Sequence, residues 1–387
     1  MHEHTIQVIA VLASIVGISE SARLGDQWGT NIHWTSETVT GEAAMLSRAF
    51  KVARMDFSWG RIESTCGSYN FSAYDTLLAQ MNSVGVRPYW IVDYGNRCYP
   101  SVDGQGCSSD ECVAAYGRFA SAAAQHFQHQ KQIIFEIINE PNGMGNDNAT
   151  TIARLSAAAW PGFHAVGATW VGPTTSGFDW PYITTTFQEG LLETVSAVSV
   201  HPYRPTMPET ALEDFAKLRT LIDQYSRGNA SVPFLDGEWG YTSATPPCAY
   251  GNRVDEATQG KYVARMWLVS TLAGAQICIS YDWRDDGLNR TQCEQNFGST
   301  YDVPTGNASV PFHPKLAYHA ALTMQRGVGE ATALTGRKQP TQVVSPGSVI
   351  TAVDVLIVAF SGNNSAAQQR VTISPPTQPS QGMFALW

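Results

Sequence analysis

The feature that most limits how this chain can fold is an alternation of strand-like and helix-like segments. Short runs of β-branched and aromatic residues predict eight strands, and apolar residues at helical spacing predict a helix after each one. The predicted strands are 28–34, 49–57, 86–94, 133–138, 169–173, 195–201, 232–238 and 275–283. The predicted helices are 40–48, 74–84, 110–128, 150–165, 180–190, 209–225, 258–272 and 314–326. Eight such units predict a closed parallel sheet, an α/β fold of the (β/α)8 TIM barrel class.

An open, doubly wound sheet is the alternative arrangement of the same alternating pattern. It would require a glycine-rich phosphate-binding turn after the first strand. No such turn follows the strand predicted at 28–34, so the closed barrel is favoured.

Segments at the two ends of the chain differ from this pattern. The apolar run Ile6–Ile18 is followed by small residues and predicts a signal peptide over 1–22, although no Lys or Arg precedes the run. A buried N-terminal strand or helix is the other interpretation of this run. The barrel is expected over 23–327. Residues 328–387 contain two strand-like stretches and predict a small β-strand module packed on the barrel.

The cysteines indicate an oxidising compartment. The chain has seven of them and no Cys-x-x-Cys pattern, which favours disulfides over a metal site. We expect the pairs Cys66–Cys98, Cys107–Cys112 and Cys248–Cys293, although sequence alone cannot fix connectivity, and a free, buried Cys278. Asn-x-Ser/Thr sequons, which predict glycosylation, occur at Asn70, Asn148, Asn229, Asn289, Asn307 and Asn363. We therefore expect a secreted, extracellular glycoprotein.

Charge and composition restrict the possible partners. The formal net charge is −9 and no basic patch is evident, which argues against a nucleic-acid partner. Beyond the leader no apolar segment predicts an integral membrane span, and we expect a monomer. The eleven Trp and fifteen Tyr residues could stack on sugar rings, but aromatic side chains are also ordinary core material.

Two glutamates follow predicted strands four and seven. The apolar run 133–138 ends at Asn139-Glu140-Pro141, and the seventh strand ends at Gly237-Glu238-Trp239-Gly240. In a parallel barrel both would reach the C-terminal lip, where catalytic groups lie. Such a pair can divide the acid and nucleophile roles of glycoside hydrolysis, with retention of configuration if the carboxyl groups are about 5–5.5 Å apart. The simpler alternatives are a capping or salt-bridging role for Glu140 and a loop position for Glu238.

This pair resembles that of the clan A glycoside hydrolases, the "four-seven" (β/α)8 retaining enzymes, over about residues 25–326. The stretches His201-Pro202-Tyr203-Arg204, 237–243, 281–287 and 314–320 resemble a cellulase-like subgroup near families 5 and 39. An inserted cysteine loop at 98–112 and a weak fifth unit depart from that pattern.

The resemblance implies a role for each matching residue. Glu140 would be the acid/base and Glu238 the nucleophile. Arg54 would bond the nucleophile, and Asn139 would bind the sugar 2-hydroxyl. His201 and Tyr203 would contact Glu238 or the sugar, and Trp283 would form the floor of the subsite for the cleaved sugar. Further candidates at the same lip are His33, Trp34, Asp93, Tyr94, Asn96, Trp239 and Asp282.

Other chemistries find less support in the sequence. His126 and His129 share a helix face but lack a third ligand, and no Gly-x-Ser-x-Gly elbow is present. We therefore expect no metal and no organic cofactor. The predicted function is retaining hydrolysis of β-glycosidic bonds in a polysaccharide or oligosaccharide. The alternatives are a β-xylosidase, an iduronidase-like enzyme or a glycosylceramidase of the same clan, or an inactive carbohydrate-binding barrel.

Overall fold

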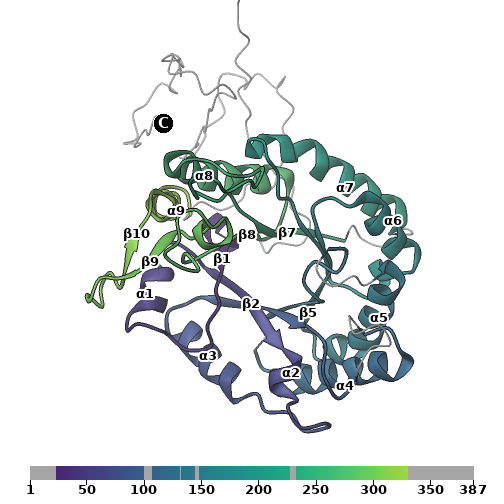
Figure 1. The fold of residues 1–387 in the computed structure, drawn as a ribbon. Helices are drawn as coiled ribbons and strands as arrows, with labels where there is room; N and C mark the ends of the chain where they lie inside the picture. Colours follow the sequence, from purple (N-terminus) through teal and green to yellow (C-terminus); the bar gives the residue numbers. More distant parts are fainter. Residues whose placement is uncertain (1–22, 100–106, 131, 144–147, 227–231, 330–387) are drawn as a thin grey trace, which may run out of the picture. The chain divides into compact units, whose positions relative to one another are not determined.

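The structure, a computed structural model, describes residues 23–99, 107–130, 132–143, 148–226 and 232–329. Eight parallel strands close into a barrel in chain order, with β1 paired to β8, and helices surround them (Figure 1). The strands are β1 (Trp28–Asn31), β2 (Val52–Ser58), β3 (Arg87–Asp93), β4 (Ile134–Glu136), β5 (Thr169–Ser176), β6 (Ala197–His201), β7 (Phe234–Trp239) and β8 (Cys278–Ser280). The predicted (β/α)8 barrel is confirmed.

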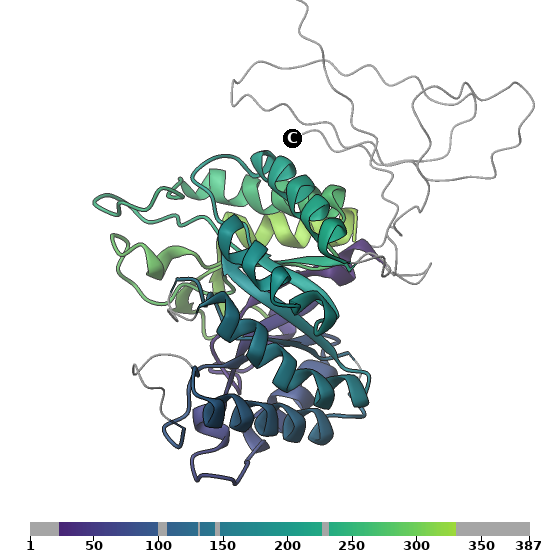
Figure 2. The ribbon, with the colours of Figure 1, turned by 90° about the vertical axis from the view of Figure 1, so that its right-hand side faces the viewer.

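The helices follow the strands in the order that a βα barrel requires. They are α1 (Glu42–Leu46), α2 (Trp59–Ile62), α3 (Ser72–Ser83), α4 (Asp110–His126), α5 (Ala149–Ala165), α6 (Trp180–Gln188), α7 (Ala211–Tyr225), α8 (Glu256–Ala273) and α9 (Leu316–Gly327). The teal helices from the middle of the chain lie along one flank of the barrel (Figure 2). No helix in these described stretches is long and apolar enough to span a membrane.

Apolar side chains pack both inside and outside the ring of strands. A small cluster contains one residue from each of the seven strands β2 to β8, together with Ile277 just before β8. A much larger cluster joins the outer strand faces to the helices. Layers of side chains therefore fill the barrel, which is a packed core rather than a pore.

Two local predictions need correction. The fifth strand, predicted at 169–173, runs to Ser176, and its pairing with β6 shifts register between Pro173 and Thr175. Pro314 does not begin the last helix. It lies in β10 (Phe312–Pro314), which pairs antiparallel with β9 (Thr300–Pro304), and α9 starts at Leu316. This hairpin follows β8 and was not expected from the sequence, because its strands are short and polar.

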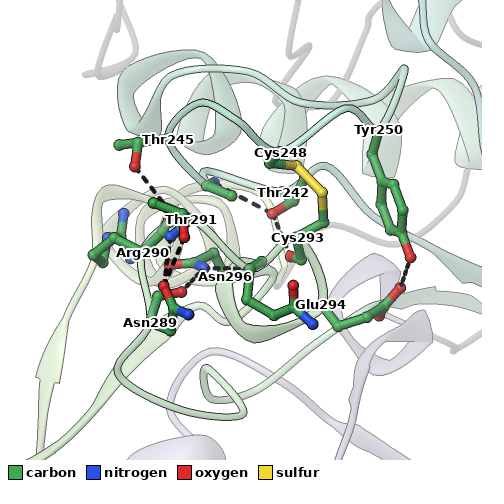
Figure 3. Close-up of a disulfide and its surroundings, with 12 residues drawn as sticks. Thr242, Thr245, Cys248, Tyr250, Asn289, Arg290, Thr291, Cys293, Glu294 and Asn296 are labelled. Carbon is green, nitrogen blue, oxygen red and sulfur yellow. Dashed lines mark hydrogen bonds between the residues drawn. A yellow bond between two sulfur atoms is a disulfide. The ribbon is translucent and has the colours of Figure 1, made fainter.

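Three disulfides join the pairs expected from the sequence, and Cys278 is free and buried. Cys248–Cys293 links the connections that follow β7 and β8 (Figure 3). The Thr242 hydroxyl donates to the Cys293 carbonyl at 2.7 Å, and Tyr250 donates to Glu294 at 2.7 Å. These bonds hold together two loops on the rim that carries Glu238, and the three disulfides fit an extracellular protein.

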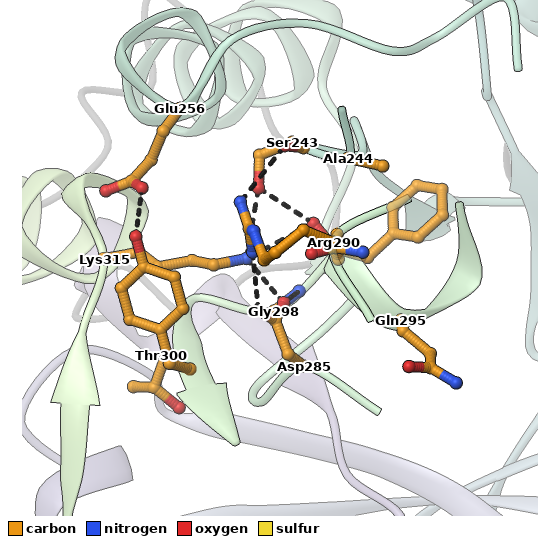
Figure 4. A network of polar contacts seen from close by, with 12 residues as sticks. Ser243, Ala244, Glu256, Asp285, Arg290, Gln295, Gly298, Thr300 and Lys315 are labelled. Carbon is orange, nitrogen blue, oxygen red and sulfur yellow. Dashed lines mark hydrogen bonds and ion pairs between the residues drawn. The ribbon is translucent and has the colours of Figure 1, made fainter. Parts of the chain in front are cut away.

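A buried ion pair fixes the connection after β8. The Lys315 ammonium lies between Asp285 and the Ser243 hydroxyl, and neither charged side chain is more than 2% exposed (Figure 4). Asp285 also accepts from the Gly298 amide at 2.9 Å and pairs with Arg290 at 3.3 Å. The start of α9 is thereby tied to the loop that follows the eighth strand.

Several predictions concern residues that the structure does not describe. The signal peptide at 1–22, nearly all of the β-strand module at 328–387, and the sequons at Asn229 and Asn363 lie outside the described residues.

Candidate active site

Glu140 and Glu238 face each other at the C-terminal lip of the barrel. Glu140 lies four residues beyond the end of β4, and Glu238 lies near the end of β7. One carboxylate oxygen of each, together with a ring nitrogen of His201, lie within 4.8 Å of one another. The ends of strands four and seven therefore bring the two carboxyl groups together.

The nucleophile candidate Glu238 is held as an anion. Oε2 accepts from Arg54 Nη1 and, at 2.7 Å, from Asn31 Nδ2, while Oε1 accepts from the Tyr203 hydroxyl at 2.8 Å. Burial alone would raise the pKa of Glu238, but the charge of Arg54 and these hydrogen bonds outweigh burial and lower it below 4.5. Glu238 therefore stays ionised through the neutral and mildly acidic range.

Gly237 and a strand irregularity explain how Glu238 reaches this position. A Cβ at Gly237 would lie 2.2 Å from Ser199 Oγ, so only glycine fits against the barrel interior there. The pairing of β7 with β8 shifts register between Asp236 and Trp239. This shift breaks the simple alternation of side chains and turns Glu238 towards Arg54.

The guanidinium of Arg54 is the buried cation of the site. It is 1% exposed and contacts two carboxylates, Glu136 and Glu238. Nη2 also donates to Asn139 Oδ1 at 2.8 Å. Burial opposes the charge, but Glu136 and Glu238 hold the pKa of Arg54 well above its usual value. Arg54 is therefore permanently charged and fixed in orientation.

His201 lies between Arg54 and Glu140. Its Nε2 lies 3.3 Å from Arg54 Nη2, and its Nδ1 lies 2.9 Å from Glu140 Oε1. Both hydrogens of Arg54 Nη2 already go to Glu136 Oε1 and Asn139 Oδ1, so His201 Nε2 is a close neighbour of the guanidinium rather than a third acceptor. The contact of Nδ1 with Glu140 Oε1 fixes the ring beside the carboxyl group of Glu140.

The backbone at Glu140 is strained, and its neighbour supports it. Glu140 has φ +44°, in the left-handed region that residues other than glycine rarely occupy. Its N–H donates to the Thr174 carbonyl at 3.1 Å, and the Thr174 hydroxyl donates to the Ile138 carbonyl at 2.6 Å. Thr174, itself at φ +58°, is the residue at which the pairing of β5 with β6 shifts register. The irregular fifth unit thus holds Glu140 in an unusual conformation, as functional sites often require.

Four predicted residues, Asn139, Arg54, His201 and Tyr203, gather around the two glutamates as described. Three others lie nearby. Asp93 is fully buried, and burial raises its pKa well above the usual value. Tyr94 is 42% exposed. His33 pairs with Asp282 at 3.2 Å; burial would lower the His33 pKa, but Asp282 raises it to about 9.

The side chain of Trp283 is buried in this structure. It is 1% exposed, it packs edge-on against Phe50, and its indole N–H donates to buried Glu42 at 3.0 Å. Its role as the floor of a sugar subsite stays a prediction. Tyr281 lies two residues earlier, directly after β8, and its ring packs edge-on against Phe297. The negative charge of Glu238 is one of the nearby charges that raise the pKa of Tyr281.

Sequence reasoning missed three residues of the site: Asn31, Glu136 and Tyr281. Asn31 and Tyr281 lie at the ends of β1 and β8, so the strand-end rule could have found them. Glu136 is a charged residue in the middle of the apolar run 133–138, which is itself a signal, because a charge is buried only when it is paired.

Two groups of described residues place three potential metal-ligand atoms within 4.8 Å of one another. The first is Glu140, His201 and Glu238, where Arg54 already balances the nucleophile. The second is His33, Asp282 and Asp286. A protonated His33 supplies the positive charge in that group at neutral pH.

A closed eight-stranded barrel with these two glutamates at the ends of strands four and seven defines a clan A glycoside hydrolase. The chain belongs to the cellulase family, glycosyl hydrolase family 5, whose model matches residues 16–273. The protein is thus a glycosidase.

Solved structures share the fold at low sequence identity. A family 39 glycoside hydrolase from Bacteroides cellulosilyticus WH2 is 20% identical with a TM-score of 0.65; the match covers 81% of this chain and 64% of that one. A family 39 β-xylosidase from Caulobacter crescentus is 16% identical, with a TM-score of 0.61 over 80% of this chain and 73% of that one. An endo-β-1,4-glucanase from Xanthomonas axonopodis pv. citri is 14% identical, with a TM-score of 0.55 over 77% and 98%. No curated protein sequence matches the chain.

Proposed function

We propose that the protein is a secreted, retaining β-glycosidase that cleaves a polysaccharide or oligosaccharide by double displacement. The observation that carries this proposal is the approach of the two carboxylates. Oxygens of Glu140 and Glu238 lie within 4.8 Å. Retaining enzymes place their carboxyl groups about 5–5.5 Å apart, whereas inverting enzymes need about 6.5–9.5 Å for an intervening water.

The contacts of the two residues support the division of roles. Ionised Glu238 attacks the anomeric carbon while Glu140 protonates the departing glycosidic oxygen, so the C–O bond breaks as the glycosyl ester forms. In the second step Glu140, now deprotonated, takes a proton from water, and that water displaces Glu238 from the anomeric carbon. The hydrogen bond from Arg54 to Asn139 Oδ1 supports the proposal that Asn139 contacts the sugar 2-hydroxyl.

Secretion and glycosylation are supported by features of the described surface. The first feature is the set of three disulfides. The second is the exposure of four sequon residues, Asn70, Asn148, Asn289 and Asn307. An exposed asparagine is a requirement for a glycan acceptor. We further propose a monomer with a carbohydrate substrate and no nucleic-acid partner, in keeping with the net charge of −9.

Another substrate class remains the second candidate. A relative described as a β-xylosidase and one described as an endo-β-1,4-glucanase share the barrel, so substrates of either kind belong in the same test. The inactive, sugar-binding barrel is the weaker alternative. The residues that the reaction would need are all present, namely Arg54, Asn139, Glu140 and Glu238. Arg54 bonds Glu238 and Asn139 directly, and His201 lies between Arg54 and Glu140.

The test is a panel of β-glucans, galactans, xylans, mannans and 4-nitrophenyl β-glycosides, with the product mass and the first-released anomer recorded. We expect cleavage with retained configuration and loss of turnover in Glu238→Gln by about four to six orders of magnitude. Glu63→Gln, at a buried glutamate that bonds Trp59 and Tyr99, is the matched control and should stay active. Near-normal turnover in Glu238→Gln would refute the assignment, and glycan binding without any product would favour the inactive barrel.

A further inference from the structure

A third glutamate, Glu136, shares Arg54 with Glu238 and is fully buried on β4. Its Oε1 accepts from Arg54 Nε at 2.9 Å and also from Nη2. Its Oε2 accepts from the Tyr89 hydroxyl and, at 3.0 Å, from the Ser199 hydroxyl. Both oxygens of this carboxylate are thus committed to donors on β2, β3 and β6.

Glu136 cannot take part in bond making or breaking, because none of its surface is exposed to a substrate. Any effect on the reaction must pass through a neighbour. The neighbour that reaches the reacting group is Arg54, which contacts Glu136 through Nε and Nη2 and contacts Glu238 through Nη1. The planar guanidinium therefore has one edge occupied by Glu136 and one nitrogen directed at Glu238.

This arrangement has an electrostatic consequence. An Arg54 charge acting on Glu238 alone in a buried site would lower its pKa strongly and make it a poor nucleophile. Glu136 offsets part of that charge. The same contact prevents the guanidinium from rotating away from Glu238 and from Nε2 of His201.

We propose that Glu136 is a positioning residue for the glycosidase reaction. It fixes the orientation of Arg54 and partly neutralises it, so that Glu238 stays ionised and yet basic enough to attack. This inference rests on the proposed function of Glu238, and its test includes a measurement that does not depend on activity.

Several titratable groups surround the two carboxylates and must be considered in any pH profile. Those around Glu238 are Arg54 from β2, Glu140 beyond β4, His201 and Tyr203 from β6 and its following loop, and Tyr281 after β8. Those around Glu136 are Arg54 from β2, with Tyr89 and Asp93 from β3. Burial holds the pKa values of Tyr89, Tyr203 and Asp93 well above their usual ranges, so these three do not ionise on the acid limb.

The decisive variant is Glu136→Gln, which keeps an oxygen acceptor for Arg54 Nε but removes the negative charge. Without that charge the ionised form of Glu238 is favoured further, so its pKa falls. We expect the acid limb of kcat/KM on the best 4-nitrophenyl glycoside to move to lower pH by about one unit or more. We also expect kcat at the plateau to fall about three- to ten-fold, because the nucleophile is weaker, with KM little changed.

Two matched variants separate this role from a structural one. Glu63→Gln places the same substitution at another buried glutamate, whose donors are Trp59, Tyr99 and the Gly67 amide. It should lower stability without moving the acid limb. Glu136→Asp keeps the charge but shortens the side chain, so we expect a limb within about half a unit of the wild type and a reduced kcat.

The activity-independent readout is a pH titration of ¹³Cδ-labelled glutamate by NMR, with the Glu238 signal assigned from Glu238→Gln. A Glu238 pKa that falls in Glu136→Gln supports the inference even if no tested glycoside is cleaved. An unchanged Glu238 titration in folded Glu136→Gln would overturn it and leave Glu136 as a structural residue. A pKa that rises would overturn it as well, because Arg54 would then have left Glu238. If Glu136→Gln does not fold, wild-type kcat and KM in Glu136→Asp would refute the positioning role.

Discussion

Removal of the Tyr203 hydroxyl tests how Glu238 is kept ionised. Tyr203→Phe deletes the hydrogen bond of 2.8 Å to Glu238 Oε1 and leaves Arg54 and Asn31 on Oε2. A hydrogen bond to a charged group contributes about 1.5–3 kcal/mol, and one pKa unit corresponds to about 1.4 kcal/mol. The pKa of Glu238 should therefore rise by about one to two units, and the acid limb of kcat/KM should move to higher pH by that amount.

The same change has a consequence for folding stability. The folded-state pKa of Glu238 lies below its usual value of 4.5, so its contribution to stability is present above that pH and is lost as pH falls through the lower value. Tyr203→Phe reduces this contribution. The difference in unfolding free energy between wild type and variant should be largest above about pH 5 and should narrow in acid.

The assay is a pH–rate profile from about pH 2.5 to 7 on one 4-nitrophenyl glycoside, together with urea unfolding at several pH values. Tyr241→Phe is the control, because Tyr241 donates at 2.6 Å to the Thr206 carbonyl rather than to a carboxylate. Tyr203→Phe and Glu136→Gln should move the limb in opposite directions. A limb that stays in place in Tyr203→Phe, or moves as far in Tyr241→Phe, would refute this account of Glu238.

Two further predictions concern the acid residue and the fold. Glu140→Ala should slow cleavage of glycosides with poor leaving groups more than that of activated aryl glycosides, because only the former need a proton on the departing oxygen; equal losses measured on both would count against the acid role. Lys315→Met should lower the unfolding free energy by about 3 kcal/mol, the low end for a broken buried pair, because Asp285 loses its buried cation but keeps Arg290 and the Gly298 amide. Burial raises the Asp285 pKa to about 6 despite Lys315. Because this folded-state pKa lies above the usual value of 3.8, stability falls as pH rises through that window. Urea unfolding should thus show a larger loss at pH 8 than at pH 5, and an equal loss at both would contradict this explanation.

The barrel and the meeting of Glu140 with Glu238 could be predicted because they depend on repeated, local signals. Apolar runs that stop at Asn139-Glu140-Pro141 and at Glu238-Trp239-Gly240 mark strand ends, and parallel strands deliver their ends to one lip. Arg54, which lies within β2 rather than at its end, was identified through the family resemblance. The three expected disulfides join loops that the barrel brings together, and the structure forms each of them.

The direction of side chains after irregular strands could not be predicted. Strand β8 has only three residues, and its pairing with β7 is shifted, so counting alternate residues from Ile279 does not tell which aromatic side chain faces the site. Trp283 was chosen through the family resemblance, which gave no role to Tyr281. The strain at Glu140 and Thr174 is likewise invisible in sequence, because it is imposed by contacts between β4 and β5 that are more than thirty residues apart.

The charges around Arg54 connect the two steps of the proposed reaction. In the free enzyme the guanidinium contacts both Glu136 and Glu238, while Glu140 contacts His201. Once Glu238 becomes a glycosyl ester it carries no charge, and a buried arginine without a counter-ion would cost several kcal/mol. The contacts of Glu136 with Arg54 Nε and Nη2 do not involve Glu238, so the guanidinium keeps a buried carboxylate partner in the intermediate. Glu136, an unreactive carboxylate on β4, would therefore limit the electrostatic cost of the covalent intermediate. A site in which Glu238 was the sole partner of Arg54 would bear that cost in full.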